Sequence, residues 1–235
     1  MMADRDVAVI VAAGGSGSRY GKAKQFEMLG NLPVYQHVVR TFSVIEPVHT
    51  IVVVGREEDI PIIEKGLHEL NPPVNWKVVP GGSTRQDSVE NGLRALQDIK
   101  DIAIVLVHDV ARALVDDVII LSVIGAIREH GSAIAGIKVV DTLKRVIEHE
   151  IVETVARENL WRAQTPQGAR LPLMLAAFEQ ARVNNYQGTD ESELLERIGE
   201  QPRLVEGSEL NFKITYPADL ERARSITKIH GIKRI

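Results

Sequence analysis

The sequence predicts an α/β fold in which helices cover both faces of a mostly parallel, twisted β-sheet. Apolar runs that resemble strands alternate with helical patterns from residue 7 to about residue 130, as in right-handed βαβ units. The first run, Val7 to Val11, is almost uninterrupted, which is typical of a strand buried on both faces. From 133 to 165 the runs shorten and follow one another closely, which predicts an antiparallel excursion.

The elements before residue 130 are expected from their periodicity. In the first helix the apolar residues Val34, Val38 and Phe42 recur every four positions and so share one face. Asp87 or Ser88 is expected to cap the third helix. The predicted elements are a strand at 7–11, a helix at 33–42, a strand at 50–54, a helix at 60–70, a strand at 75–79, a helix from 87 or 88 to 99, a strand at 102–107 and a helix at 118–129. Together they predict a Rossmann-like sheet.

The second half adds short strands, helices and one projecting segment. We expect β segments at 134–140, 143–147 and 151–155, helices at 171–183 and 191–198, short strands at 204–205 and 210–214, and a closing helix at 217–228. The span 144–157 is charged and has few residues to bury, so it is expected to project as an antiparallel β-arm at about 140–160. An isolated hairpin is marginally stable, and a homodimer is the simplest source of a partner surface.

Size and composition bound the class of protein. The 235 residues are 44% hydrophobic and 26% charged, which predicts one globular domain over 1–235. A net charge of −4 argues against nucleic acid as a partner. The lack of cysteine excludes disulfides and Cys-ligated zinc. No apolar run approaches the roughly 18 residues of a membrane span, and residues 1–6 are charged, so we expect a cytoplasmic protein without a membrane partner.

A glycine-rich loop follows the first strand. Its glycines at 14, 15 and 17 allow backbone N–H groups to approach an anion, and Arg19, Lys22 and Lys24 follow. The loop matches neither the P-loop pattern nor a complete GxGxxG. A purely structural turn with solvated cations is the alternative. Three cations close to the glycines, at the carboxyl edge of a parallel sheet, favour a phosphate site.

Other polar residues are expected at the same edge. Asp109 directly follows a strand, where it can serve as a magnesium or ribose ligand; the alternative is a local ion pair with Arg112. His108 is expected to be buried and hydrogen-bonded. Strand alternation would place Lys213 either toward an anion or toward solvent, and both remain open. Residues 189–193 look first like a helix N-cap with an acidic first turn, although Thr189 can also offer its hydroxyl to a phosphate.

Several of these segments also resemble a known family, in the family's order. They are the glycine loop with Arg19 and Lys24-Gln25, Pro80-Gly81-Gly82 with Arg85-Gln86-Asp87-Ser88-Val89, Val107 to Arg112, Asp141 to Arg145, Trp161 to Gln167, Thr189 to Ser192, and Asn211 to Thr215. Together they resemble the 2-C-methyl-D-erythritol 4-phosphate cytidylyltransferases of the non-mevalonate isoprenoid pathway. The resemblance spans nearly the whole chain.

The resemblance implies a role for each matching residue. CTP would be bound by Ala13, Gly14, Gly15, Gly81, Gly82, Asp87, Ser88 and Asp109, and catalysis would depend on Arg19, Lys24 and Lys213. The sugar phosphate would contact Arg112, Thr142, Arg157, Thr165 and Thr189. Mg²⁺ would be held by Asp109 or through the CTP phosphates. The arm of such enzymes enters a second subunit, so the resemblance implies a homodimer with composite sites.

The implied reaction is transfer of CMP from CTP to 2-C-methyl-D-erythritol 4-phosphate by direct attack on the α-phosphate. The alternatives are a ribitol-5-phosphate cytidylyltransferase, a dinucleotide-dependent dehydrogenase and a non-catalytic nucleotide-binding module. The chain departs from the family pattern where only five positions separate Arg19 from Lys24 and Ala23 replaces a proline, which leaves Lys22 as an alternative to Lys24. Val110 and Ala113 replace the usual alanine and proline beside Asp109.

Overall fold

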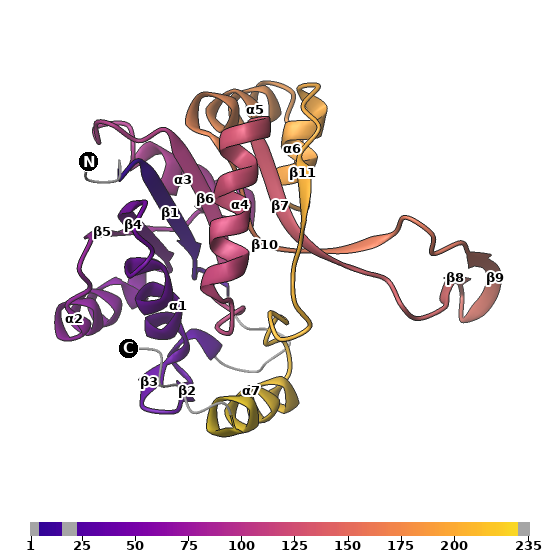
Figure 1. Cartoon of the computed structure of the whole chain (residues 1–235), viewed down its shortest axis with the longest axis horizontal. Coiled ribbons are helices and arrows are strands. Elements are labelled where there is room, and N and C mark those ends of the chain that lie inside the picture. Colours follow the sequence, from indigo (N-terminus) through magenta and orange to yellow (C-terminus); the bar gives the residue numbers. More distant parts are fainter. Residues whose placement is uncertain (1–4, 16–22, 230–235) are drawn as a thin grey trace.

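A seven-stranded sheet forms the centre of the computed structural model, which describes residues 5–15 and 23–229 (Figure 1). Its strand order is β11-β7-β10-β6-β1-β4-β5. The strands are β1 (Val7–Ala12), β4 (Val48–Gly55), β5 (Asn75–Pro80), β6 (Ile104–Asp109), β7 (Ser132–Lys138), β10 (Trp161–Arg170) and β11 (Arg203–Glu206). Strand β10 is antiparallel to β6 and β7, whereas the other described pairs in this sheet are parallel. The predicted mostly parallel α/β sheet is confirmed.

Helices cover both faces of this sheet. One face carries α1 (Val34–Ser43), α2 (Ile60–Leu70), α4 (Asp117–His130) and α7 (Pro217–Ile229); the other carries α3 (Arg85–Arg94), α5 (Leu171–Val183) and α6 (Glu191–Arg197). In β1, Val9 packs into the hydrophobic core under α1, α2, α4 and α7, and Ile10 packs into the core under α3, α5 and α6. Neither side chain is exposed. Burial of such a side chain is worth about 1.5–3 kcal/mol, which explains why β1 is apolar at every position.

Shorter elements complete the body around this sheet. They are the 3-10 turns η1 (Lys24–Phe26) and η2 (Glu57–Asp59) and the hairpin of β2 (Met28–Leu29) and β3 (Leu32–Pro33). None of the helices in the described parts of the chain is both long and apolar enough to cross a bilayer.

Two local predictions are wrong, and one strand was not predicted. Residues 161–170 form the long strand β10, whose polar side chains Gln164 and Gln167 are buried and hydrogen-bonded and therefore give no apolar signal. Residues 210–214 form no strand, because this segment is held by isolated contacts rather than a ladder. Helix α3 ends at Arg94, and its cap is Thr84, whose hydroxyl accepts the Asp87 N–H at 3.0 Å.

The predicted antiparallel arm is present and projects from the body (Figure 1). It consists of β8 (Leu143–Ile147) and β9 (Glu150–Val155), which form a separate two-stranded sheet. Its polar side chains pair across the hairpin, as in the ion pair of Arg145 with Glu153 at 2.7 Å. Its larger apolar side chains, Val146, Ile147, Ile151 and Val152, are all more than half exposed.

Candidate active site

A cavity of about 380 Å³ lies at the carboxyl ends of β1 and β6. Five separate segments line it. They contribute Ala12, Ala13, Gly14 and Gly15; Lys24 and Gln25; Gly82, Ser83, Thr84, Arg85 and Ser88; Asp109, Val110 and Ala111; and Lys213 and Thr215. The structure therefore brings together the glycine loop, the start of α3, the end of β6 and the segment that contains Lys213.

The glycines around the cavity differ in what surrounds them. Among the described residues, no atom lies within 4 Å of a Cβ at Gly15, and a Cβ at Gly14 would make only ordinary contacts. A Cβ at Gly82, in contrast, would overlap the side chain and backbone of Asp87. Gly82 is therefore required by packing within the protein, whereas the surroundings of Gly15 leave open space beside the cavity.

Lys24 enters the cavity from η1, and its neighbour anchors this turn. Gln25 is 1% exposed and donates from Nε2 to Oδ2 of Asp59 at 3.3 Å. Asp59 is itself held by Arg56, which donates from Nε at 2.8 Å and from Nη2 at 2.9 Å. The lysine is thus attached to a fixed turn. Arg19 and Lys22 lie outside the described residues, so the choice between Lys22 and Lys24 stays a prediction.

At the start of α3, predicted nucleotide residues divide into two groups. Gly82 and Ser88 line the cavity, and the Ser88 hydroxyl donates to the Thr84 carbonyl at 2.8 Å. Gly81 and Asp87 are absent from the cavity lining. The Asp87 carboxylate accepts hydrogen bonds from the Ser83 hydroxyl and the Thr84 N–H, and these bonds lower its pKa. In this structure Asp87 therefore holds the turn at Ser83 and Thr84 that precedes α3.

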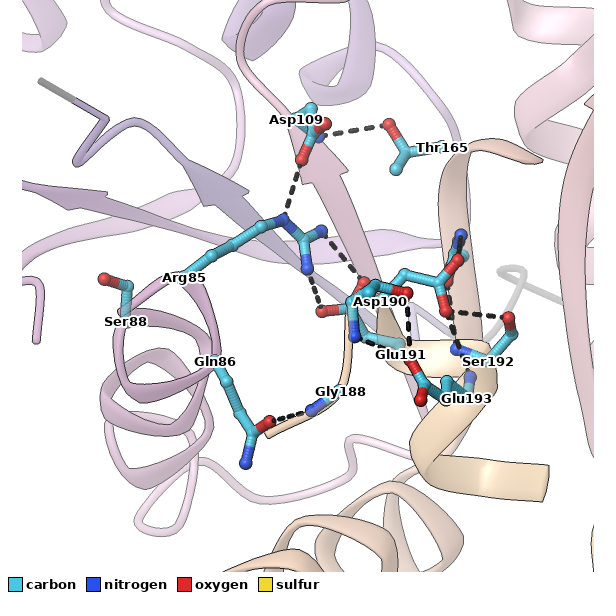
Figure 2. A network of polar contacts seen from close by, with 12 residues as sticks. Arg85, Gln86, Ser88, Asp109, Thr165, Gly188, Asp190, Glu191, Ser192 and Glu193 are labelled. Atoms are coloured by element: carbon cyan, nitrogen blue, oxygen red, sulfur yellow. Dashed lines mark hydrogen bonds and ion pairs between the residues drawn. The ribbon is translucent and has the colours of Figure 1, made fainter. Parts of the chain in front are cut away.

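A chain of alternating charges begins in the cavity wall and extends behind it to Glu191, and Figure 2 shows Arg85, Asp109 and Glu191. Arg85 donates from Nε to Oδ1 of Asp109 at 3.1 Å and from Nη1 and Nη2 to the two Glu191 oxygens at 2.7 and 2.9 Å. The other Asp109 oxygen, Oδ2, accepts from Nζ of Lys213 at 2.7 Å. The order is therefore Glu191, Arg85, Asp109 and Lys213, with a net charge of zero.

Burial makes these charges interact strongly. The Glu191 side chain is 1% exposed and that of Asp109 is 11% exposed. Burial raises the pKa of Asp109, but Arg85 and Lys213 outweigh it and hold this pKa well below the usual range. Burial also raises the pKa of Glu191, and Arg85 offsets only part of that effect. Asp109 is thus a carboxylate at any physiological pH.

The predicted alternative pairing of Asp109 with Arg112 is wrong. Arg112 instead donates from Nη1 to the Asn211 carbonyl at 2.8 Å and from Nη2 to the Ala163 carbonyl at 3.3 Å. Arg112 does not line the cavity. It ties the end of β6 to the segment that precedes Lys213, since Asn211 is two positions before the lysine.

His108 is buried and hydrogen-bonded, as predicted. It has no exposed surface, and burial lowers its pKa to about 4, so the ring is neutral at pH 7. Its Nε2–H donates to the Arg112 carbonyl at 3.2 Å, which leaves Nδ1 to accept from the Thr165 hydroxyl at 3.0 Å. That hydroxyl oxygen in turn accepts the Asp109 N–H at 3.1 Å. The chain of hydrogen bonds fixes the backbone of Asp109.

The predicted sugar-phosphate residues do not line the cavity within one chain. Thr165 is buried behind Asp109. Thr189 donates its N–H and its hydroxyl to Oε2 of Glu193 at 2.7 and 2.8 Å. Thr142 and Arg157 are exposed residues of the arm region, where Arg157 donates to the Val140 carbonyl.

The residues that the structure describes do not form a metal site by themselves. They contain no group of three or more His, Asp or Glu side chains placed to hold an ion. Asp109 is the one carboxylate among the described cavity-lining residues, and its two oxygens already accept from Arg85 and Lys213. A divalent cation in this cavity would therefore need oxygen ligands from a bound phosphate.

Comparison with known proteins gives the family. A family model described as 2-C-methyl-D-erythritol 4-phosphate cytidylyltransferase matches residues 7–228. The chain belongs to this family. The cytidylyltransferase of Solibacter usitatus is 40% identical over 230 residues, which cover 92% of this chain and 93% of that protein. The Bacillus cereus enzyme is 37% identical over 223 residues, covering 94% and 97%.

Solved structures of the cytidylyltransferase family have the same fold. The Thermus thermophilus enzyme superposes with a TM-score of 0.80 at 30% identity, covering 95% of this chain and 99% of that one. A 4-diphosphocytidyl-2C-methyl-D-erythritol synthase from Anaerococcus prevotii has a TM-score of 0.82 at 28% identity, covering 94% and 98%. The predicted resemblance and the prediction of a CTP-dependent nucleotidyltransferase are confirmed.

Two residues of this cytidylyltransferase-family chain were not among the predicted site residues. Arg85 and Glu191 are 106 positions apart, and no local pattern connects them. Both residues belong to segments that carry the family resemblance, which is the available signal. The sequence pattern places Glu191 as an acid in the first turn of a helix, and that pattern does not distinguish a solvated carboxylate from a buried one.

Proposed function

We propose that the chain transfers CMP from CTP to 2-C-methyl-D-erythritol 4-phosphate, giving 4-diphosphocytidyl-2-C-methyl-D-erythritol and pyrophosphate. One observation carries the proposal: the glycine loop, Lys24 and Lys213 surround a single cavity in a chain of this family. Backbone N–H groups beside glycines and two lysines suit a triphosphate.

The proposed chemistry needs no protein nucleophile. A phosphate oxygen of the sugar phosphate attacks the α-phosphorus of CTP, the bond from the α-phosphorus to the bridging oxygen breaks, and pyrophosphate leaves in line. Positioning and neutralisation of charge then account for catalysis. Lys24 and Lys213 are placed to stabilise the charge that develops on the phosphates, each by a few kcal/mol. The sequence predicts the same role for Arg19.

Mg²⁺ is proposed as the cofactor, held mainly through CTP. When bound, the ion would neutralise phosphate charge and so help both the approach of the second substrate and the departure of pyrophosphate. Asp109 faces the same cavity and would offer an oxygen only if Lys213 moved from Oδ2 to a phosphate.

The arm is proposed to complete the site of a second subunit in a homodimer. Thr142 and Arg157 are exposed and do not line the cavity of their own chain. The arm also exposes the apolar side chains Val146 and Ile151, which a partner surface would cover. In this arrangement one chain would bind CTP and the arm of the other would contact the sugar phosphate.

A pyrophosphate-release assay tests the reaction. Purified protein is incubated with CTP, Mg²⁺ and either 2-C-methyl-D-erythritol 4-phosphate or ribitol 5-phosphate. We expect that pyrophosphate is released only when 2-C-methyl-D-erythritol 4-phosphate is present. Release with ribitol 5-phosphate alone would identify the other cytidylyltransferase, and CTP binding without release would identify a non-catalytic module.

A further inference from the structure

The polar network beside the cavity joins three distant segments through Arg85 (Figure 2). Arg85 begins α3, Asp109 ends β6 and Glu191 begins α6. All three guanidinium nitrogens are used, one toward Asp109 and two toward Glu191. Glu191 does not line the cavity, so it can affect a ligand there only through its neighbours.

Glu191 fixes the direction in which Arg85 points. A carboxylate that accepts two parallel N–H bonds holds the planar guanidinium in one orientation. Glu191 is itself held in the first turn of α6, whose cap Asp190 accepts the Glu193 N–H at 3.0 Å. Beside it, the Ser192 N–H donates to Oε1 of the buried Gln167 at 3.0 Å. The guanidinium Nε is therefore aimed at Oδ1 of Asp109.

Glu191 also sets the charge that Lys213 experiences. Without it, the full positive charge of Arg85 would act on Asp109 and would compete with Lys213 for that carboxylate. With it, Arg85 is shared between two carboxylates, and Asp109 keeps a net attraction for the lysine. Charges at such separations interact more strongly in a poorly solvated site than in water.

We propose that Arg85 and Glu191 are a positioning pair that, through Asp109, fixes Nζ of Lys213 in the nucleotide cavity, a role that rests on the proposed CMP transfer. A purely structural ion pair between α3 and α6 is the competing explanation. Such a pair would affect activity only as far as it affects the fold. Replacing a buried ion pair by apolar side chains often leaves stability unchanged, so a double replacement can separate the two explanations.

The first test combines Glu191→Gln with Lys213→Ala and measures kcat and KM for CTP at a temperature at which each variant is folded. Glu191→Gln alone is expected to lower kcat roughly 10- to 100-fold with KM for CTP nearly unchanged. In the Lys213→Ala background the same substitution is expected to have less than about a 2-fold effect, since the group that it positions is gone. Independent, multiplying effects on kcat would overturn the proposal.

The second test separates positioning from stability. The double variant Arg85→Met/Glu191→Leu removes both charges, so no unpaired buried charge remains. We expect a melting temperature close to that of the unmodified enzyme and a kcat that stays at least about 10-fold lower. Recovery of kcat together with the melting temperature would show a structural role only. If Glu191→Gln does not fold, the Arg85→Met/Glu191→Leu variant still distinguishes a positioning role from a structural one.

A matched control comes from α3, the helix that begins with Arg85. Glu90 pairs with Arg94 at 2.6 Å on the exposed side of α3, away from the cavity lining, so Glu90→Gln should leave kcat unchanged. Failure of the proposed function has a different signature, because the unmodified enzyme would then release no pyrophosphate from CTP and 2-C-methyl-D-erythritol 4-phosphate. An active enzyme whose Glu191→Gln variant keeps full kcat would overturn the positioning role alone.

Discussion

The cavity and the arm hold their predicted site residues in opposite ways. In the cavity, Asp109 is nearly buried and is fixed by Arg85, Lys213 and the Thr165 hydroxyl. In the arm region, Thr142 and Arg157 are exposed, and the side-chain pairs of β8 and β9 lie within the hairpin, as between Lys144 and Thr154 at 2.6 Å.

This contrast shows which half of the site one chain can build by folding. The cavity side chains have their orientation set by ion pairs between segments up to 106 positions apart, so they are in place once the sheet is formed. Exposed side chains on a hairpin keep their rotamer freedom until another surface orders them. The cavity side chains are therefore preorganised within one chain, whereas the proposed contact of the arm residues with the acceptor would depend on association.

The largest effect is expected from removing a lysine of the preorganised half. Lys213→Ala or Lys24→Ala should lower kcat roughly 100-fold or more, because in the proposed reaction each removes a positive charge that faces the transferred phosphate. The Lys213 side chain is 38% exposed and Asp109 keeps its hydrogen bond from Arg85, so the Lys213→Ala variant should stay folded at the assay temperature. Steady-state kinetics with both substrates measures this.

Lys65→Ala is the matched control. Lys65 is 79% exposed on α2, and its Nζ makes only a long contact of 3.9 Å with the Glu69 carboxylate. It should behave like the unmodified enzyme. Near-normal turnover for both cavity variants would remove the basis for assigning either lysine to catalysis.

Subunit complementation tests whether the arm half belongs to a second chain. Lys213→Ala and Arg157→Ala are each expected to be poorly active. When their subunits are mixed and exchanged, half of the dimers should be mixed, and each mixed dimer holds one intact composite site. Activity should then rise to about a quarter of the unmodified level. A mixture that stays as inactive as its components would show that Arg157 serves its own chain or no site at all.

Gly15 and Gly82 allow a test of which glycine leaves space for a ligand and which one is required by packing. Gly15→Ala adds a methyl group that has no atom of the described part of the chain within 4 Å, so the fold should be unaffected. If the triphosphate occupies this space, the Kd for CTP should rise about 10-fold. Isothermal titration with CTP and a thermal melt measure the two quantities.

Gly82→Ala is the opposite case, because its Cβ would overlap Asp87 and should lower the melting temperature. Unchanged CTP affinity in a well-folded Gly15→Ala variant would argue against a triphosphate at the glycine loop.

Sequence patterns predicted the body better than the site, for physical reasons. The run from Val7 to Val11 is apolar because both faces of β1 are buried, and that demand is visible at every position. Strand β10 was missed because its buried Gln164 and Gln167 satisfy their polar groups through long-range hydrogen bonds. The pairing of Arg85 with Glu191 leaves no periodic signal either, since it depends on how α3 and α6 meet.

The last test concerns the hydrogen bonds that hold the backbone of Asp109, and it measures stability rather than turnover. The pKa of His108 is about 4 in the folded protein and about 6.5 when unfolded, so the unfolded chain binds the proton more readily. The stability linked to His108 is fully present above pH 6.5 and is lost as pH falls toward 4, by roughly 1 kcal/mol per pH unit. Glu191, whose pKa burial raises, contributes with the opposite sign near the acidic end of this window. Urea unfolding of His108→Gln alongside the unmodified protein cancels that contribution, and the variant should lose less stability over this pH range. Equal pH dependence of the two proteins would mean that the ring beside Asp109 is not held neutral by burial.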